Sequence, residues 1–212
     1  MEENMEMRIL KIMSKIKVAL RVRPLSSRER DEKYPLVVQV ENNSAFITDI
    51  RVPEKPAADS RQRFRQFDFD HAFWLTDCCE WGASQEEVYN EMAPALEKSI
   101  LQGYNACLLA YGQSGTGKTH TMLGTKTDPG LIPRLCHSLW EKLRQGRENS
   151  SFRMEVSFME IYREKVRDLL TPDKPLKLRE HPQNGPHVQD FSHESYCSEM
   201  GIVEALTETQ CT

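Results

Sequence analysis

The sequence predicts an α/β domain with a mixed, mainly parallel sheet and flanking helices, and three observations support this class. Segments in which apolar and polar residues alternate, as in strands, are followed along the chain by segments with helical periodicity, and this order repeats. A short, wholly apolar run, 106–111, is typical of a central strand that is buried on both faces. A glycine-rich turn follows this run directly and leads into a further helical segment.

Composition and charge narrow the class of protein. The 212 residues suit a single domain, and 39% hydrophobic with 28% charged residues is typical of a globular chain. The formal net charge of -4 provides no basic field, so we expect no nucleic acid among the partners. No apolar run approaches the roughly 18 residues of a membrane span, so we expect no direct membrane insertion. Six cysteines without a Cys-x-x-Cys pair indicate reduced thiols and hence the cytoplasm.

The amino-terminal half carries the first predicted strands. Residues 16–23 alternate between apolar and polar side chains, and Pro24 ends the alternation. Residues 36–40 and 45–48 are separated by an Asn-Asn-Ser turn, which predicts a β-hairpin. Residues 64–73 are rich in aromatic side chains and predict a further strand.

A long helix is predicted over residues 84–103. Ser84 and Glu87 have the spacing of a capping box, which satisfies backbone donors at the start of a helix. Apolar residues recur at four-residue intervals, and Gly103 is suited to cap the end of the helix. Pro94 lies inside the segment, so we expect a break or kink there.

The remaining segments continue the alternation of helices and strands. Residues 131–146 predict an amphipathic helix, and residues 154–158 predict a strand. An Asn-Gly dipeptide between residues 176–180 and 187–191 predicts a β-hairpin. A last helical segment begins near Ser198.

The glycine-rich turn fits the phosphate-binding pattern G-x-x-x-x-G-K-[ST] at every fixed position. The residues of the pattern are Gly112, Gln113, Ser114, Gly115, Thr116, Gly117, Lys118 and Thr119. Glycines let successive backbone N–H groups face a polyphosphate, and the strand, loop and helix context is the one that this motif requires. Lys118 is expected to reach the β- and γ-phosphates, and Thr119 is the predicted metal ligand, for Mg2+. The fold class predicted is therefore of the P-loop NTPase type.

Several segments resemble the kinesin motor domain. They are residues 21–24 (Arg-Val-Arg-Pro), 67–73, 110–122, 156–162 and 164–170. The resemblance is continuous enough to divide the chain into three parts. We expect an amino-terminal extension over residues 1–14, a partial kinesin-like motor domain over residues 15–206, and a divergent carboxyl tail over residues 207–212.

The resemblance also implies a ligand and a partner. In such a site Arg21, Arg23 and Pro24 line the adenine side of bound ATP, and His120 lies beside the base. A guanidinium plane and a proline ring both offer flat faces to a heterocycle. The resemblance further implies ATP and Mg2+ as cofactors, microtubules (tubulin) as partner, and a location on the cytoskeleton in the cytoplasm.

Two segments that the family uses for hydrolysis are absent from these 212 residues. They read N-x-x-S-S-R-S-H and D-x-x-G-S-E, and the only Ser-Ser-Arg of the chain, at residues 26–28, is followed by Glu. We therefore expect a chain truncated before these segments, with a sheet that is incomplete at the carboxyl end. A strand over residues 106–111 would then lack ladder partners.

The interpretation that follows is an ATP-binding microtubule motor protein, kinesin-like and deficient in hydrolysis as this chain. One alternative is a non-catalytic truncated isoform that acts as a tubulin- or motor-binding module. The other is an unrelated P-loop kinase or GTPase, against which the match at residues 21–24 argues.

Overall fold

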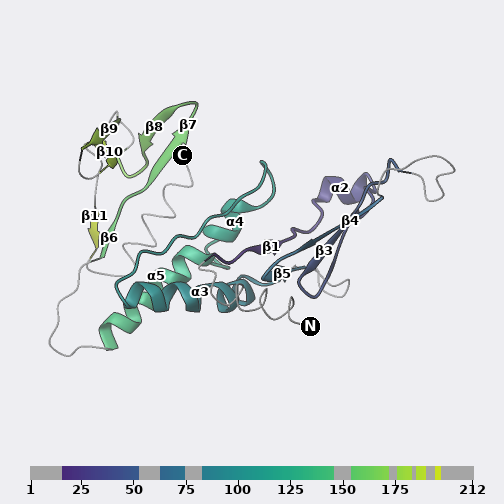
Figure 1. Ribbon diagram of the computed structural model, residues 1–212, viewed down its shortest axis with the longest axis horizontal. Helices are drawn as coiled ribbons and strands as arrows, with labels where there is room; N and C mark the ends of the chain where they lie inside the picture. Colours follow the sequence, from purple (N-terminus) through teal and green to yellow (C-terminus); the bar gives the residue numbers. More distant parts are fainter. Residues whose placement is uncertain are drawn as a thin grey trace, which may run out of the picture. The chain divides into compact units, whose positions relative to one another are not determined.

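The computed structural model describes residues 16–52, 63–74, 83–145, 154–171, 176–182, 185–189 and 194–196 (Figure 1). The chain divides into two compact units. The first unit holds residues 1–91 and 112–117, and the second holds residues 92–111 and 118–212. The amino-terminal extension and the helix predicted near Ser198 lie outside the described residues.

A parallel pair of short strands belongs to the first unit. β1 (Ala19–Arg21) pairs along its whole length with β5 (His71–Phe73). The strand predicted over residues 16–23 is thus confirmed over three residues. Just ahead of it, the Val18 backbone N–H donates a hydrogen bond to the Asp70 carboxylate (2.9 Å), which ties the two strands together at one end.

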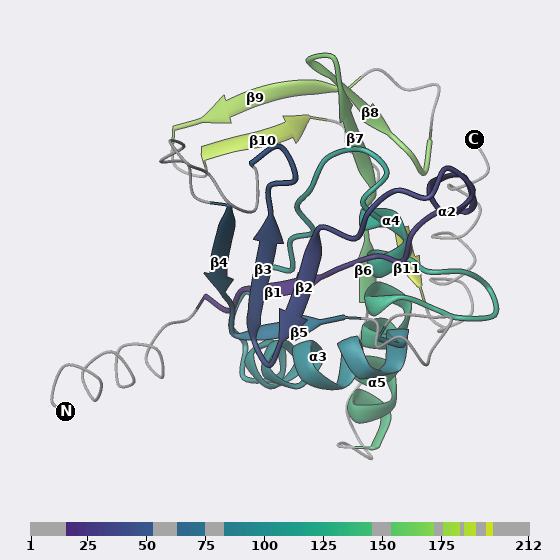
Figure 2. The ribbon, with the colours of Figure 1, turned by 90° about the vertical axis from the view of Figure 1, so that its right-hand side faces the viewer.

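Three antiparallel strands form a second sheet in the first unit, in the order β2, β3, β4 (Figure 2). β2 (Val38–Glu41) and β3 (Ser44–Thr48) are the arms of the predicted hairpin, which is confirmed. β4 (Phe64–Asp68) pairs with the other edge of β3. The aromatic segment therefore forms two strands, β4 and β5, where a single strand was predicted. Ala45 on β3 is buried, with 3% of its surface exposed.

The long predicted helix is α3 (Gln85–Leu101), which begins in the first unit and continues in the second. Its capping box is confirmed, because the Glu87 N–H donates to the Ser84 hydroxyl (3.0 Å) and the Ser84 N–H donates to the Glu87 carboxylate (2.7 Å). Gly103 follows the helix with a φ of 84°, as a carboxyl cap requires. A break or kink was predicted at Pro94, and the break is not found. The helix continues through this exposed proline, where solvent can replace the missing hydrogen bond.

Two helices follow in the second unit. α4 (Lys118–Met122) is a single short turn and contacts α5 (Leu131–Gln145), the predicted amphipathic helix. The buried residues of α5 are Leu131, Pro133 and Trp140. The Lys142 ammonium of α5 forms an ion pair with the buried carboxylate of Glu97 on α3.

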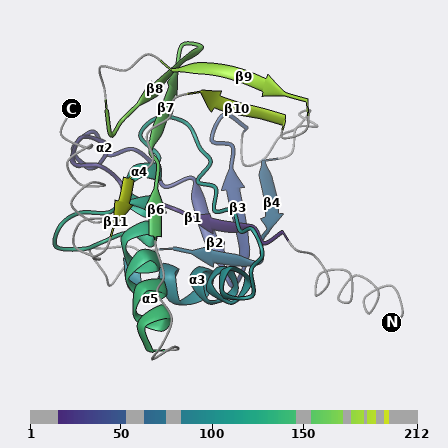
Figure 3. The ribbon, with the colours of Figure 1, turned by 90° about the vertical axis from the view of Figure 1, so that its left-hand side faces the viewer.

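Three antiparallel strand pairs complete the described part of the second unit (Figure 3). Their members are β6 (Met154–Val156) with β11 (Glu194–Tyr196), β7 (Met159–Tyr162) with β8 (Lys165–Asp168), and β9 (Lys177–His181) with β10 (Gly185–Gln189). The last pair is the hairpin predicted around the Asn-Gly dipeptide, and Gly185 takes a positive φ of 74° there. Asp168, at the end of β8, is fully buried and accepts hydrogen bonds from the N–H groups of Leu170 and Thr171.

Residues 106–111 do not form the predicted buried strand. Within the described part of the chain, no backbone hydrogen bond joins residues 105–111 to another residue. Leu109 is 80% exposed and Tyr111 is 96% exposed. The prediction is wrong because an apolar run supplies side chains for burial but no hydrogen-bond partner, and a strand needs both.

Candidate nucleotide-binding site

The glycine-rich loop over residues 112–117 has the backbone shape that its sequence predicts. Gly115 and Gly117 have φ values of 81° and 92°, in the left-handed region that glycine adopts without strain. Gly112 lies so close to Thr116 that an added Cβ would come within 2.6 Å of the Thr116 hydroxyl oxygen. That hydroxyl donates a hydrogen bond to the Gln113 carbonyl (2.8 Å), so the side chain closes the loop from within.

The loop presents backbone donors that its own fold does not use. The N–H groups of Ser114, Gly115 and Gly117 make no hydrogen bond to any residue in the described ranges. Ser114 and Gly115 are exposed. Successive amides in a turn of this kind form a concave site for an anion, and phosphate oxygens are acceptors of matching size and charge. The loop therefore fits a phosphate group.

Lys118, Thr119 and His120 follow the loop directly in the chain and form the start of α4. Lys118 is half-buried, whereas Thr119 and His120 are exposed. An exposed threonine hydroxyl is a suitable oxygen ligand for Mg2+, which is usually bound by one or two protein oxygens together with phosphates and water. Among the described residues there is no cluster of three or more His, Cys, Asp or Glu side chains suited to hold a metal alone.

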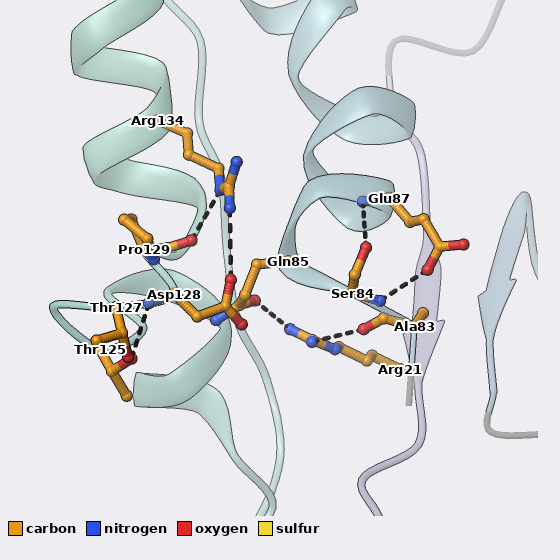
Figure 4. Close-up of polar contacts among 10 residues, drawn as sticks. All are labelled: Arg21, Ala83, Ser84, Gln85, Glu87, Thr125, Thr127, Asp128, Pro129 and Arg134. Atoms are coloured by element: carbon orange, nitrogen blue, oxygen red, sulfur yellow. Dashed lines mark hydrogen bonds and ion pairs between the residues drawn. The ribbon is translucent and has the colours of Figure 1, made fainter. Parts of the chain in front are cut away.

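Arg21 is fixed by contacts with the start of α3 (Figure 4). Its guanidinium donates one hydrogen bond to the side-chain oxygen of Gln85 (2.7 Å) and another to the carbonyl of Ala83 (2.9 Å). Gln85 is buried, with 1% of its surface exposed. Arg21 thus connects β1 to α3 within the first unit, a structural role in addition to any contact with a base.

Arg23 is paired with Glu29 on α2 (Ser27–Asp31). Its two terminal nitrogens donate to the two carboxylate oxygens at 2.7 and 2.8 Å, and one of them also donates to the Pro24 carbonyl (2.8 Å). The hydrogen bonds from Arg23, followed by those from Ser26, lower the pKa of Glu29 to about 2. The pKa of Arg23 is raised, chiefly by its hydrogen bond to Glu29.

The structure distributes the predicted site residues over both units. Arg21, Arg23, Pro24 and the loop 112–117 belong to the first unit, and residues 118–120 belong to the second. Sequence reasoning missed the residues that fix the two arginines, namely Ser26, Glu29, Ala83 and Gln85. The Ser-x-x-Glu spacing of Ser26 and Glu29 is a readable capping signal. No spacing rule points to Gln85.

A glycine-rich loop between an apolar segment and a helix is the arrangement of the P-loop NTPase class. A model of the protein family described as "Kinesin motor domain" matches residues 21–211 of the chain. The chain belongs to the kinesin motor domain family. The resemblance seen in the sequence is therefore confirmed, and so is the α/β P-loop fold class.

Individual relatives agree with the family assignment. Human kinesin-like protein KIF16B is 41% identical over 204 residues, which is 92% of this chain and 15% of that protein. Drosophila melanogaster kinesin-like protein Klp98A is 40% identical over 199 residues, which is 92% of this chain and 16% of that protein. The chain thus spans a small part of these relatives.

A solved structure of a KIF14 dimer with AMP-PNP, in complex with a microtubule, shares the fold with a TM-score of 0.79 and 35% identity. The match covers 92% of this chain and 53% of that one. A second KIF14 structure, with ADP and a microtubule, has a TM-score of 0.74 and 36% identity, and covers 93% of this chain and 55% of that one. In the described part of this chain, none of the helices has the length and apolar character needed to cross a bilayer.

Proposed function

We propose that this chain is the nucleotide-binding part of an ATP-driven microtubule motor. The observation that carries the proposal is the row of unused N–H donors at Ser114, Gly115 and Gly117 on a loop shaped by glycine. Donors of this kind bind phosphate oxygens with little reorganisation, because the fold of the loop does not use them for hydrogen bonds of its own. Family membership makes ATP the nucleotide of choice, since the KIF14 relatives carry AMP-PNP or ADP.

Each predicted site residue has a distinct task in this proposal. The Lys118 ammonium neutralises charge on the β- and γ-phosphates, and the Thr119 hydroxyl holds Mg2+. Mg2+ held there would supply charge neutralisation at the phosphate oxygens. Arg21, Arg23 and Pro24 form the adenine side of the site, and His120 lies beside the base.

The partner proposed is the microtubule, and the location proposed is the cytoskeleton in the cytoplasm. Both KIF14 structures are complexes with a microtubule. We extend this partner to the present chain on the basis of its family and fold, and we assign the motor segment to residues 15–206.

The finer proposal concerns hydrolysis. The 212 residues contain neither N-x-x-S-S-R-S-H nor D-x-x-G-S-E, so they lack a group to position the attacking water. On their own they are expected to bind ATP and to release phosphate at a negligible rate. The same absence favours the second candidate, a non-catalytic module that binds tubulin or a motor partner.

The nucleotide proposal is tested by binding of a fluorescent ATP analogue to the purified chain. Lys118→Ala is expected to weaken binding at least tenfold, because it removes the cation that directly follows the loop. Lys126→Ala is the matched control, since Lys126 is an exposed lysine a few residues further along the chain. Equal binding by the wild type and Lys118→Ala would remove the site assignment.

The two candidate functions differ in how nucleotide affects microtubule binding. A motor segment is expected to co-sediment with microtubules more strongly with AMP-PNP than with ADP. Co-sedimentation that ignores the nucleotide would favour the non-catalytic module. Failure to co-sediment under both conditions would contradict the microtubule partner.

A further inference from the structure

We infer that Glu29 is a positioning residue for the nucleotide base, because it fixes the plane of the Arg23 guanidinium while the Arg23 side chain stays partly exposed. The inference rests on the proposed function, which places Arg23 on the adenine side of an ATP site. It adds a residue outside the predicted site, on α2, and a physical reason for its presence there.

Three hydrogen bonds fix the Arg23 guanidinium. Two run in parallel from its terminal nitrogens to the carboxylate oxygens of Glu29, at 2.7 and 2.8 Å. The third runs from one of these nitrogens to the Pro24 carbonyl, at 2.8 Å. A bidentate pair sets the orientation of both planar groups, and the third bond removes the remaining freedom to pivot.

Glu29 is itself held at the start of α2. Its carboxylate accepts hydrogen bonds from the Ser26 N–H (2.8 Å) and the Ser26 hydroxyl (2.9 Å). Its own N–H donates in return to the Ser26 hydroxyl (3.3 Å), which completes a capping box. The carboxylate is therefore part of the helix cap, and its position is set by the backbone of α2.

The arginine keeps free surface and free donors. Its side chain is 40% exposed, and its Nε–H and the second hydrogen of one terminal nitrogen bond to no residue in the described ranges. A guanidinium in a fixed plane is suited to stack on a flat heterocycle. Because folding has already ordered this long side chain, binding of a base loses less entropy.

The stability of the fold gives little reason for this arrangement. Exposed ion pairs contribute little to folding, since the gain is offset by the ordering of both side chains and by solvent screening. The pair between Arg23 and Glu29 has bidentate geometry and is anchored on a helix cap. Its effect is to fix the orientation of the Arg23 guanidinium. The neighbouring Arg28 and Glu32 show the contrast, with a single contact at 2.7 Å and an Arg28 side chain that is 81% exposed.

The test compares two ligands on the full chain. ATP offers phosphates and a base, whereas inorganic tripolyphosphate offers phosphates alone. Glu29→Gln is expected to weaken ATP binding by roughly fivefold and to leave tripolyphosphate binding unchanged. Glu32→Gln is the matched control, because it removes the same charge from the carboxyl cap of the same short helix, at a residue that pairs with Arg28 and makes no contact to Arg23. Both affinities are measured by displacement of a fluorescent ATP analogue.

Two further variants separate orientation of the arginine from stabilisation of the helix. Ser26→Ala weakens the cap but leaves the Glu29 carboxylate paired with Arg23, so it is expected to change ATP affinity less than Glu29→Gln does. Adding Glu29→Gln to Arg23→Ala is expected to cause no further loss, because the group that Glu29 orients is then absent.

The possible outcomes distinguish this inference from the proposed function. If Lys118→Ala binds ATP as the wild type does, the proposed function fails, and there is no bound base for Glu29 and Arg23 to position. If binding depends on Lys118 but Glu29→Gln leaves ATP affinity unchanged, the positioning role is overturned. It is also overturned if Glu29→Gln weakens tripolyphosphate as much as ATP, or if Ser26→Ala reproduces the whole effect.

Discussion

Gly124 permits a close approach of two backbone segments in the second unit. It has a φ of 73°, and an added Cβ would overlap the backbone N of Gly130 and the carbonyl oxygen of Asp128. We predict that Gly124→Ala lowers the free energy of unfolding by about 2–4 kcal/mol, because backbone strain and overlap add. Urea denaturation measures the change.

Gly103 provides the control for this prediction. It has a φ of 84°, but nothing lies within 4 Å of an added Cβ. Gly103→Ala is therefore expected to cost only about 1 kcal/mol, the cost of the left-handed conformation. Equal losses in the two variants would show that the close approach at Gly124 has no energetic weight.

The carboxylate of Glu29 gives a second test at the scale of the residue. Its pKa is lowered from 4.5 to about 2, first by the hydrogen bonds from Arg23 and then by those from Ser26. The small stabilisation that this exposed pair contributes is therefore complete above the ordinary pKa, and it is lost as the pH falls through about 2. Carbon-13 NMR of the side-chain carboxyl is expected to show titration near pH 2, and Arg23→Ala should raise the pKa. Titration near pH 4.5 in the wild type would contradict the pairing.

At the scale of single residues, the sequence predicts backbone conformations that depend on a residue and its neighbours in the chain. The positive φ values of Gly115 and Gly117 follow from the phosphate-loop pattern. The partner of Arg21 is different, because Gln85 lies 64 positions away in the chain. Only the pairing of β1 with β5 and the position of α3 bring such residues together.

Among the elements, α3 shows how local signals and solvent together decide the outcome. Its capping box and glycine cap were predicted correctly, since each depends on a few consecutive residues. The break at Pro94 was not found, because the proline lies on the exposed side of the helix. The rule against proline applies with less force where water can satisfy the carbonyl left unpaired.

The ion pair between α3 and α5 gives a prediction about elements. The Glu97 residue is 4% exposed, whereas the Lys142 side chain is 47% exposed. Removing the lysine takes one cation away from a buried carboxylate. Lys142→Met is expected to lower the free energy of unfolding by about 1–3 kcal/mol. Lys98→Met, at an exposed lysine of α3, is the control and should change stability by less than about 0.5 kcal/mol in urea denaturation.

At the scale of the whole molecule, the segment 105–111 is a region of the described backbone without protecting hydrogen bonds. It makes no backbone hydrogen bond to a described residue, and its apolar side chains are largely exposed. Amide hydrogens here are expected to exchange with deuterium at close to the rate of an unfolded chain, while those of α3 exchange far more slowly. Mass spectrometry of the exchanged peptides measures both. Protection of this segment equal to that of α3 would contradict the structure.

The segment 105–111 also shows the difference between the elements that the sequence predicts and those that it does not. The local elements, among them the two hairpins and the helices 85–101 and 131–145, were predicted close to their observed bounds. The buried central strand was not found, because its existence depends on neighbours that no local pattern contains. Loops and caps are decided locally, whereas a strand is decided by what lies beside it.

The short loop between α4 and α5 has a consequence for engineering. A bridge between Gly124 and Pro129 closes its base, and the Arg134 guanidinium donates to the Pro129 carbonyl (2.8 Å) and pairs with Asp128 (3.4 Å) (Figure 4). The tip, with Lys126 and Thr127, is exposed. The contacts that hold the loop closed all lie at its base, and lengthening a loop adds little closure entropy. A foreign peptide grafted between Lys126 and Thr127 should therefore leave both helices intact. The tip is thus a point of attachment for an epitope or a fluorophore.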